Sequence, residues 1–289
     1  MKKQHLLSYL LLWIAAITIP ACQKEKQQPI ASSPETFDIS ETVVVPETDG
    51  FSARGKNSHN NSCNTFYGSA VQMGNGHVRS WINIRKSDNK PLALGIEMTD
   101  CSLQNLSMDP LNFAGNTFFL ALHPKALSTT PFNHIAINWE PAGHEPPGIY
   151  DVPHFDMHFY RISIPEQLNI SPVPGTPPPA GYLPVSYVIE GATVPQMGTH
   201  WLDPSFPELP PTLSPFTHTL IYGSNNGQVI FLEPMITRAF ILSGASVAKS
   251  IPQPINFSPV NTNYPAEYKI WKNTNNNRHY ISLANFLWR

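Results

Sequence analysis

The chain has 289 residues, a formal net charge of −2 and a charged fraction of only 13%. Such a balance gives no electrostatic footprint for nucleic acid, so we expect no nucleic-acid partner. The 30 prolines are spread along the chain and argue against a fold of long helices, because an interior proline removes a helical hydrogen bond and clashes with the preceding turn.

Residues 1–21 have the pattern of a secretory signal. Lys2 and Lys3 precede an apolar run at residues 6–19, which is too short to span a bilayer comfortably. Cys22 directly follows Ala21, which resembles a bacterial lipoprotein signal whose cysteine is lipidated and becomes the mature N-terminus. We therefore expect a lipid-anchored protein of the cell envelope, at the outer membrane, on either its periplasmic or its surface face. The alternative is a plain signal followed by an unmodified cysteine.

Residues 22–61 have low hydrophobicity and mixed charge, so we expect a disordered tether that cannot bury enough apolar surface to fold. Residues 62–289 then form one domain, a size that all-β domains reach without splitting. Cys63 and Cys101 lie in this domain. In an oxidising compartment they are a candidate disulfide, and two independent buried thiols are the alternative.

The sequence of the domain predicts a series of short strands. Gly/Asn-rich turns at residues 74–76 and 223–227 each join two apolar segments and predict hairpins. We expect strands at residues 70–73, 77–84, 92–98, 118–122, 134–139, 217–222 and 228–232. Short helical turns are expected near residues 103–106 and 165–168, and a proline-rich loop at 172–184. This pattern predicts an all-β domain, an antiparallel β-sandwich or a barrel-like fold.

The segment 144–160 crowds three histidines and three acids into a chain that is poor in ionisable groups. Its end predicts a strand on which His154, Asp156, His158 and Tyr160 share one face. His154 and His158 would then lie roughly 13 Å apart, too far for both to reach one ion without a bulge or a helical turn. Two neighbouring side chains, about 6.6 Å apart along the strand, fit one ion better.

Other parts of the same segment restrict its interpretation. His144-Glu145 begins like a helical zinc motif, but Pro146-Pro147 excludes the helix. The face that carries His154 continues toward Ile162 and Ile164, so we expect the polar cluster to point toward the core. The opposite face holds Phe155, Met157 and Phe159, for which ordinary core packing, a covering loop and a second subunit are the alternatives.

Two further side chains are expected to complete the site. His200 lies beside Gly198, and Glu233 ends an apolar strand. Together with His154, Asp156 and His158 they form a common ligand set for zinc, iron or manganese. Hydrolysis by a bound water and iron-based oxygen chemistry are both open. The rival interpretation is a non-enzymatic binding module or homo-oligomeric assembly module, in which the cluster is a structural hydrogen-bond network.

Several of these segments resemble a family of bacterial secreted proteins whose function is unknown. The resemblance is carried by Gly143-His144-Glu145-Pro146-Pro147, by Pro153-His154-Phe155-Asp156-Met157-His158-Phe159-Tyr160 and by Met197-Gly198-Thr199-His200-Trp201. It extends over about residues 67–242. It implies a β-rich envelope domain and brings no reaction and no catalytic residue.

Overall fold

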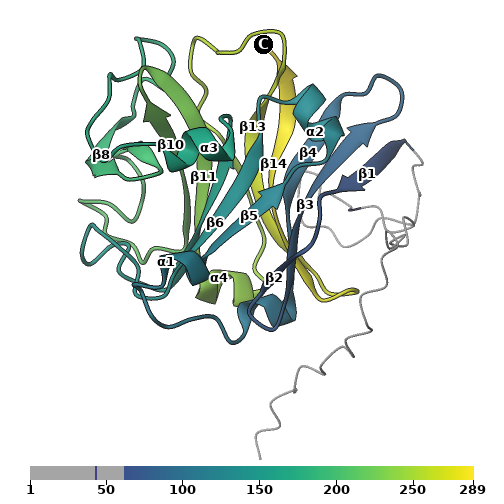
Figure 1. Cartoon of the computed structure of the whole chain (residues 1–289), viewed down its shortest axis with the longest axis horizontal. Helices are drawn as coiled ribbons and strands as arrows, with labels where there is room; N and C mark the ends of the chain where they lie inside the picture. Colours follow the sequence, from purple (N-terminus) through teal and green to yellow (C-terminus); the bar gives the residue numbers. More distant parts are fainter. Residues whose placement is uncertain (1–42, 44–61) are drawn as a thin grey trace, which may run out of the picture. The chain divides into compact units, whose positions relative to one another are not determined.

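The computed structural model describes Val43 and residues 62–289. The expected signal, the expected lipidation site Cys22 and nearly all of the expected tether lie outside the described residues. The domain is a sandwich of two antiparallel sheets, as predicted (Figure 1). Among the described residues, no helix has the length and hydrophobicity that a membrane span would need.

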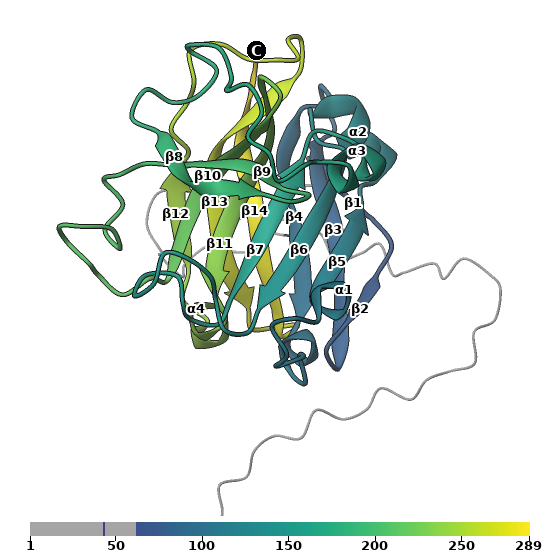
Figure 2. The ribbon, with the colours of Figure 1, turned by 60° about the vertical axis from the view of Figure 1, so that its left-hand side comes forward.

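Each layer of the sandwich is a seven-stranded sheet, seen one behind the other in Figure 2. Sheet A has the order β1-β3-β4-β14-β13-β12, with β2 paired to β3. Its strands are β1 (Cys63–Tyr67), β2 (Val71–Met73), β3 (Gly76–Arg85), β4 (Pro91–Thr99), β12 (Val247–Ser250), β13 (Asn263–Asn273) and β14 (Arg278–Trp288). Sheet B has the order β5-β6-β7-β11-β10-β9-β8. Its strands are β5 (Thr117–Ala121), β6 (His134–Glu140), β7 (His154–Tyr160), β8 (Val188–Val194), β9 (Gly198–Leu202), β10 (His218–Asn225) and β11 (Gln228–Thr237).

Helices are confined to short turns between strands, as the prolines require. They are η1 (Asp100–Leu103), α1 (Phe113–Asn116), α2 (Pro124–Thr129), α3 (Ile164–Leu168) and α4 (Arg238–Ser243). Of the two expected turns, α3 lies where it was predicted, and η1 begins three residues earlier than expected. Residues 172–184 form a loop, as predicted.

The two predicted hairpins are confirmed. Strand β2 pairs with β3, and β10 pairs with β11. The second turn has positive φ at Asn226 (46°) and Gly227 (80°), the backbone of a type I′ turn, which matches the twist of the flanking strands. The longest hairpin, β13 with β14, was not predicted.

The main core lies between the sheets. It combines inner-face side chains of sheet A, such as Ile82 and Leu94, with those of sheet B, such as Ile137 and Leu232. Phe155, Met157 and Phe159 belong to this core and are 0% exposed. Ordinary core packing is therefore the correct alternative for these three side chains, and they form no docking face for another subunit.

The opposite face of β7 does not point toward the core, contrary to the sequence-based expectation. The strand ends at Tyr160, and Ile162 packs with Tyr160 and Phe231 in a smaller apolar cluster on this same face, not against sheet A. His154, Asp156 and His158 instead lie on the outer face of sheet B. They are nevertheless no more than 3% exposed, because the connections 141–153 and 203–217 bring Tyr150 and Phe216 over them.

The expected Cys63–Cys101 disulfide is absent, since Cys63 is a free thiol. Cys63 pairs with Arg85 at one end of β3, whereas η1, which contains Cys101, lies against Gly76 at the other end. A strand of ten residues separates these ends by roughly 30 Å. A disulfide requires the two Cα atoms to lie within about 7 Å.

Val43 is the one described residue of the expected tether, and it is not free. It packs on the outer face of sheet A against Trp81 and Trp271 and is 6% exposed. Its carbonyl accepts a hydrogen bond of 3.2 Å from Asn83. At this point the segment is docked on the domain.

Candidate metal sites

The outer face of sheet B collects ionisable side chains from several strands and one loop. Two groups of ligand atoms arise there, and within each group all the atoms lie within 4.8 Å of one another. Group 1 is His144, His154 and Asp156, and group 2 is His158, His200 and Glu233. Strand β7 contributes to both, so the two groups are neighbours on one sheet.

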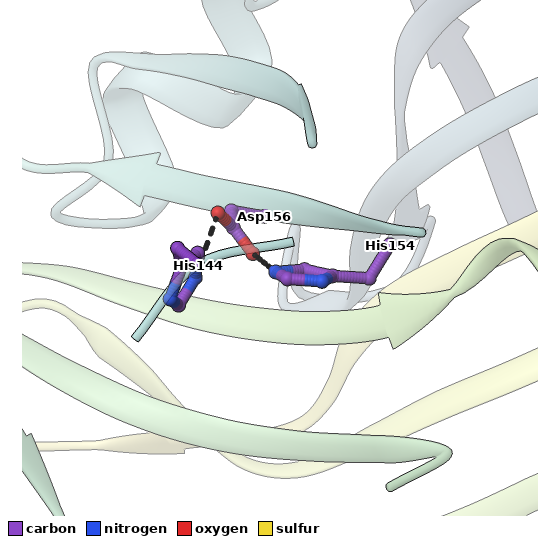
Figure 3. A group of neighbouring side chains, drawn as sticks. All are labelled: His144, His154 and Asp156. Atoms are coloured by element: carbon purple, nitrogen blue, oxygen red, sulfur yellow. Dashed lines mark ion pairs between the residues drawn. The ribbon is translucent and has the colours of Figure 1, made fainter. Parts of the chain in front are cut away.

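Group 1 is built around the carboxylate of Asp156, as Figure 3 shows. Its Oδ1 lies 3.0 Å from Nε2 of His154, and its Oδ2 lies 3.5 Å from Nε2 of His144. His154 and Asp156 are neighbours on one face of β7. His144 comes from the loop that joins β6 to β7 and returns over the start of that strand.

Backbone carbonyls orient both imidazole rings of group 1. Nδ1 of His144 lies 2.6 Å from the carbonyl oxygen of Glu145, and Nδ1 of His154 lies 2.7 Å from that of Val152. Each Nδ1 therefore donates its proton to a carbonyl, and in the neutral ring Nε2 keeps a free lone pair. A backbone acceptor on the far nitrogen is the usual support of a metal-ligating histidine.

The contact between His154 and Asp156 is close but is not a hydrogen bond. Although 3.0 Å apart, Nε2 and Oδ1 are misaligned, and both are buried atoms without a hydrogen-bond partner. An unsatisfied buried polar atom costs about 1–3 kcal/mol. The two atoms are placed as ligands of a shared cation would be.

The pKa values of group 1 reflect mutual attraction. Burial by itself would raise the pKa of Asp156, but His154 and His144 hold it well below its usual range. Burial would likewise lower the pKa of His144, but Asp156, the Glu145 carbonyl and Glu140 raise it to about 9. The side chain of His144 is 40% exposed, so group 1 opens to solvent on this side.

Group 2 is more deeply enclosed. The register on either side, Leu232 with Phe159 and Met235 with Asp156, sets His158 across from Glu233. Oε2 of Glu233 lies 3.4 Å from Nε2 of His158 and 3.6 Å from Nε2 of His200. Both ring nitrogens of His158 and this Oε2 are buried without a hydrogen-bond partner.

Phe231 positions the two imidazoles of group 2. Its ring centroid lies 4.7 Å from that of His158 and 5.4 Å from that of His200. The ring crosses over Gly223, where an added Cβ would lie 1.9 Å from the Phe231 ring. Because Gly223 also pairs with His200 in the sheet, the missing side chain lets all three rings meet.

Without a cation, burial drives every member of group 2 toward its neutral form. It lowers the pKa of His158 to about 3 and that of His200 to about 4. Burial, with the nearby acids Asp156, Glu190 and Glu140, raises the pKa of Glu233 well above its usual range. Neutral imidazoles are the form that binds metals, and a cation would favour the ionised carboxylate.

The same face carries an excess of acids. Burial raises the pKa of Glu140 and that of Glu190 to about 7, and it also raises the pKa of Glu208. In the described part of the chain, no lysine or arginine forms an ion pair with these acids or with the carboxylates of Asp156 and Glu233; Arg79, Arg85, Lys269, Lys272 and Arg278 pair with other acids. Buried carboxylates are normally paired or bound to metal.

The spacing of the ligand atoms suits a tetrahedral ion. Zinc binds nitrogen and oxygen at about 2.0–2.2 Å, which places two ligands of one ion about 3.3 Å apart. The four separations between histidine and carboxylate atoms, 3.0, 3.5, 3.4 and 3.6 Å, lie close to this value. Each group supplies three ligands and leaves a fourth position for water or substrate.

The structure brings together all five residues that the sequence singled out, but in two groups. His154 and Asp156 meet as the neighbouring pair that strand geometry favoured, while His158 joins His200 and Glu233. As expected, His154 and His158 belong to different groups. Sequence reasoning missed His144, Glu140, Glu190, Glu208 and Tyr150.

A matched contrast exists on the same face. His134 is 2% exposed, and its Nε2 lies 2.7 Å from Oε1 of Gln167, an aligned hydrogen bond. Its ring stacks on Tyr160 at 5.0 Å. In His134 this hydrogen bond engages Nε2, whereas Nε2 of His154 and Nε2 of His158 have no hydrogen-bond partner.

Comparison of the chain with protein-family models, with curated proteins and with solved structures finds no match. Function must therefore be argued from the site.

Proposed function

We propose that this chain is a metal-binding protein that holds two divalent ions side by side on the outer face of sheet B. The observation that carries the proposal is the placement of the ligand atoms. They lie 3.0–3.6 Å apart, four of them are buried without a hydrogen-bond partner, and no lysine or arginine of the described residues pairs with the two carboxylates. A structural hydrogen-bond network would join these atoms, as it joins His134 to Gln167.

The donor set narrows the choice of ion. Two imidazoles and one carboxylate with an open position are the ligands of many zinc enzymes and of non-haem iron centres, and manganese also accepts them. We place zinc first because the spacing of the atoms fits a tetrahedral ion. An ion bound in either group would lower the pKa of a coordinated water and polarise an oxygen atom of a bound molecule.

The surrounding side chains suit proton transfer. Burial brings the pKa of Glu140 and that of Glu190 to about 7, so each could hold or release a proton near neutral pH. Glu190 pairs with His200 in the sheet, beside group 2. Hydrolysis at group 1, which opens to solvent at His144, is the reaction class that we favour over oxygen chemistry.

Metal analysis of the full chain, purified in detergent without a histidine tag, tests the proposal. We expect two equivalents of metal in the wild type and one in either Asp156→Ala or Glu233→Ala. His134→Ala is the matched control and should retain two equivalents. Wild-type protein that takes up no zinc and melts at the same temperature with and without it would refute the proposal.

We further propose that the protein is anchored in the envelope by lipid at Cys22. The support is the sequence of residues 1–22 alone. Labelling of cells with a radioactive fatty acid, followed by fractionation, should place labelled wild type in the outer membrane. Cys22→Ser should carry no label and leave the membrane fraction.

A further inference from the structure

A cavity lies away from the metal groups, between the two sheets. It has a volume of about 190 Å³. Its wall includes Tyr222 and Leu232, which belong to the inner face of sheet B, and Tyr264 of sheet A. His158 and Glu233 lie on the outer face of the same sheet, so the cavity and the metal groups are on opposite sides of it. The exposed residues Gln228 and Asn256 also line the cavity and connect it to solvent.

The cavity contains one charged side chain, Arg161, which directly follows strand β7. The guanidinium carbon lies 4.9 Å from the ring centroid of Tyr264 and 5.9 Å from that of Phe132. No acid lines the cavity, and Arg161 forms no ion pair within the described residues. Its Nε is buried and has no hydrogen-bond acceptor.

Aromatic rings compensate this cation only in part. Arg161 is half-buried, and a cation–π contact contributes about 0.5–2 kcal/mol without replacing the hydrogen bonds that a carboxylate would supply. The hydroxyls of Tyr222 and Tyr264 donate to the carbonyls of Pro252 (2.7 Å) and Pro259 (2.6 Å), so both are already engaged as donors. The cavity therefore has one uncompensated positive charge.

Gln253 supplies the complementary polar group. Its Nε2 donates to the carbonyls of Ile251 (2.9 Å) and Pro265 (3.1 Å), which fixes the orientation of the amide. Its Oε1 is buried and accepts no hydrogen bond. A ligand that pairs with Oε1 of Gln253 needs a hydrogen-bond donor.

We propose that this cavity binds a small monocarboxylate that also carries a hydroxyl group, with the carboxylate on Arg161 and the hydroxyl donating to Gln253. The planar guanidinium matches a carboxylate with two parallel hydrogen bonds. One arginine with no second cation balances a single negative charge, which favours a carboxylate over a doubly charged phosphate. Phe257, whose ring centroid lies 4.8 Å from that of Tyr264, provides a flat apolar wall for a planar ligand body. The volume is below that of drug-sized sites, so the ligand is small.

Calorimetric titration of the full chain in detergent tests this assignment. The protein is treated with EDTA so that no carboxylate binds through a metal. The probes are 4-hydroxybenzoate and lactate, with 4-hydroxybenzamide as the neutral counterpart and inorganic phosphate as the competing anion. We expect saturable binding of at least one carboxylate, and at least tenfold weaker binding of 4-hydroxybenzamide and of phosphate.

Variants separate binding from folding. Arg161→Met should weaken carboxylate binding at least tenfold and melt no lower than the wild type, because it removes an uncompensated charge and keeps the apolar stem. Arg85→Met is the matched control, an exposed arginine on β3, and should bind like the wild type. The proposal is overturned if neither carboxylate binds the wild type, if phosphate or the neutral amide binds as tightly, or if Arg161→Met binds unchanged. Failure of Arg161→Met to fold would also overturn it, since the cation would then be a structural element.

Discussion

The substitution Glu233→Gln should change the stability of the protein in opposite directions with and without metal. Glutamine has nearly the same shape as a protonated glutamic acid. In the metal-free protein, burial and the nearby acids keep the pKa of Glu233 well above its usual value of 4.5, so folding favours the protonated form of this carboxyl. A raised carboxyl pKa means that the folded state binds more protons than the unfolded chain, and its stability falls as pH rises above 4.5.

The size of the effect follows from the difference between the usual pKa of a glutamate, 4.5, and the pH of the measurement, 7. Protonating a carboxyl of pKa 4.5 at pH 7 costs about 1.4 kcal/mol for each unit of difference, or about 3 kcal/mol. Glutamine needs no proton, so Glu233→Gln should stabilise the metal-free chain by up to about 3 kcal/mol at pH 7. The gain should shrink toward zero near pH 4.5. With zinc at a thousand times its dissociation constant, the wild type gains about 4 kcal/mol at group 2, and the variant loses this gain together with its charged ligand.

Urea denaturation followed by tryptophan fluorescence, in EDTA and in zinc, measures both differences. Glu208→Gln is the matched control: it also removes a buried acid with a raised pKa, but it lies outside both groups, so its response to zinc should equal that of the wild type. If Glu233→Gln is less stable than the wild type in EDTA and zinc does not alter the difference, Glu233 is a structural hydrogen-bonding residue and the metal assignment of group 2 is wrong.

Three further outcomes are expected. Burial lowers the pKa of His200 to about 4, so between pH 6.5 and 4 the unfolded chain binds a proton that the folded chain does not. As the pH falls through this range, the free energy of unfolding of the metal-free wild type should decrease by about 1.4 kcal/mol per pH unit relative to His200→Gln. Urea titrations measure this difference. Gly223→Ala places a methyl against the Phe231 ring and should destabilise by about 1–3 kcal/mol in thermal melts, with loss of zinc from group 2 only; an unchanged melt would contradict the packing. Phe155→Ala should cost about 3–5 kcal/mol, and light scattering should show the same oligomeric state as the wild type, whereas dissociation of an oligomer would show that this face is an interface.

The strands that were predicted correctly are those with a local signature. The two hairpins have apolar segments on both sides of a Gly/Asn turn, and the Asn226-Gly227 pair specifies its own backbone. Hairpin β13–β14 has a turn of asparagines, ending in Asn277 at positive φ, and its strands mix charged with aromatic residues. Its signal is therefore weaker, and it was missed.

The direction of the polar face of β7 was predicted wrongly because a strand sequence shows two faces but not which one meets the second sheet. The error came from taking the apolar Ile162 as a sign of the main core, whereas it packs with Tyr160 and Phe231 in a smaller cluster on the outer face. The sequence does contain a stop signal: Ser163 and Glu166 form a capping box with Pro165 in the first turn of α3. This signature ends the strand before Ser163.

The place of His144 in group 1 was not predicted from the sequence, for a related reason. Excluding the helical zinc motif is correct, since Glu145 to Tyr150 forms turns. However, a ligand can also come from the connection between two paired strands. Because β6 and β7 are adjacent, their connection must return to the start of β7, beside His154. The position of His144 beside His154 therefore follows from the connection between two adjacent strands and not from the spacing of a sequence motif.

Alternate positions of strand β7 carry two kinds of side chain. Three apolar side chains face the core, and three ionisable side chains face outward. A shift of the strand by one residue against β6 or β11 would exchange the two sets and place two imidazoles and a carboxylate between the sheets. Each buried charge or unpaired polar group would cost several kcal/mol, so misaligned pairings are strongly disfavoured. The residues that we assign to metal binding therefore also help to set the register of β7 during folding.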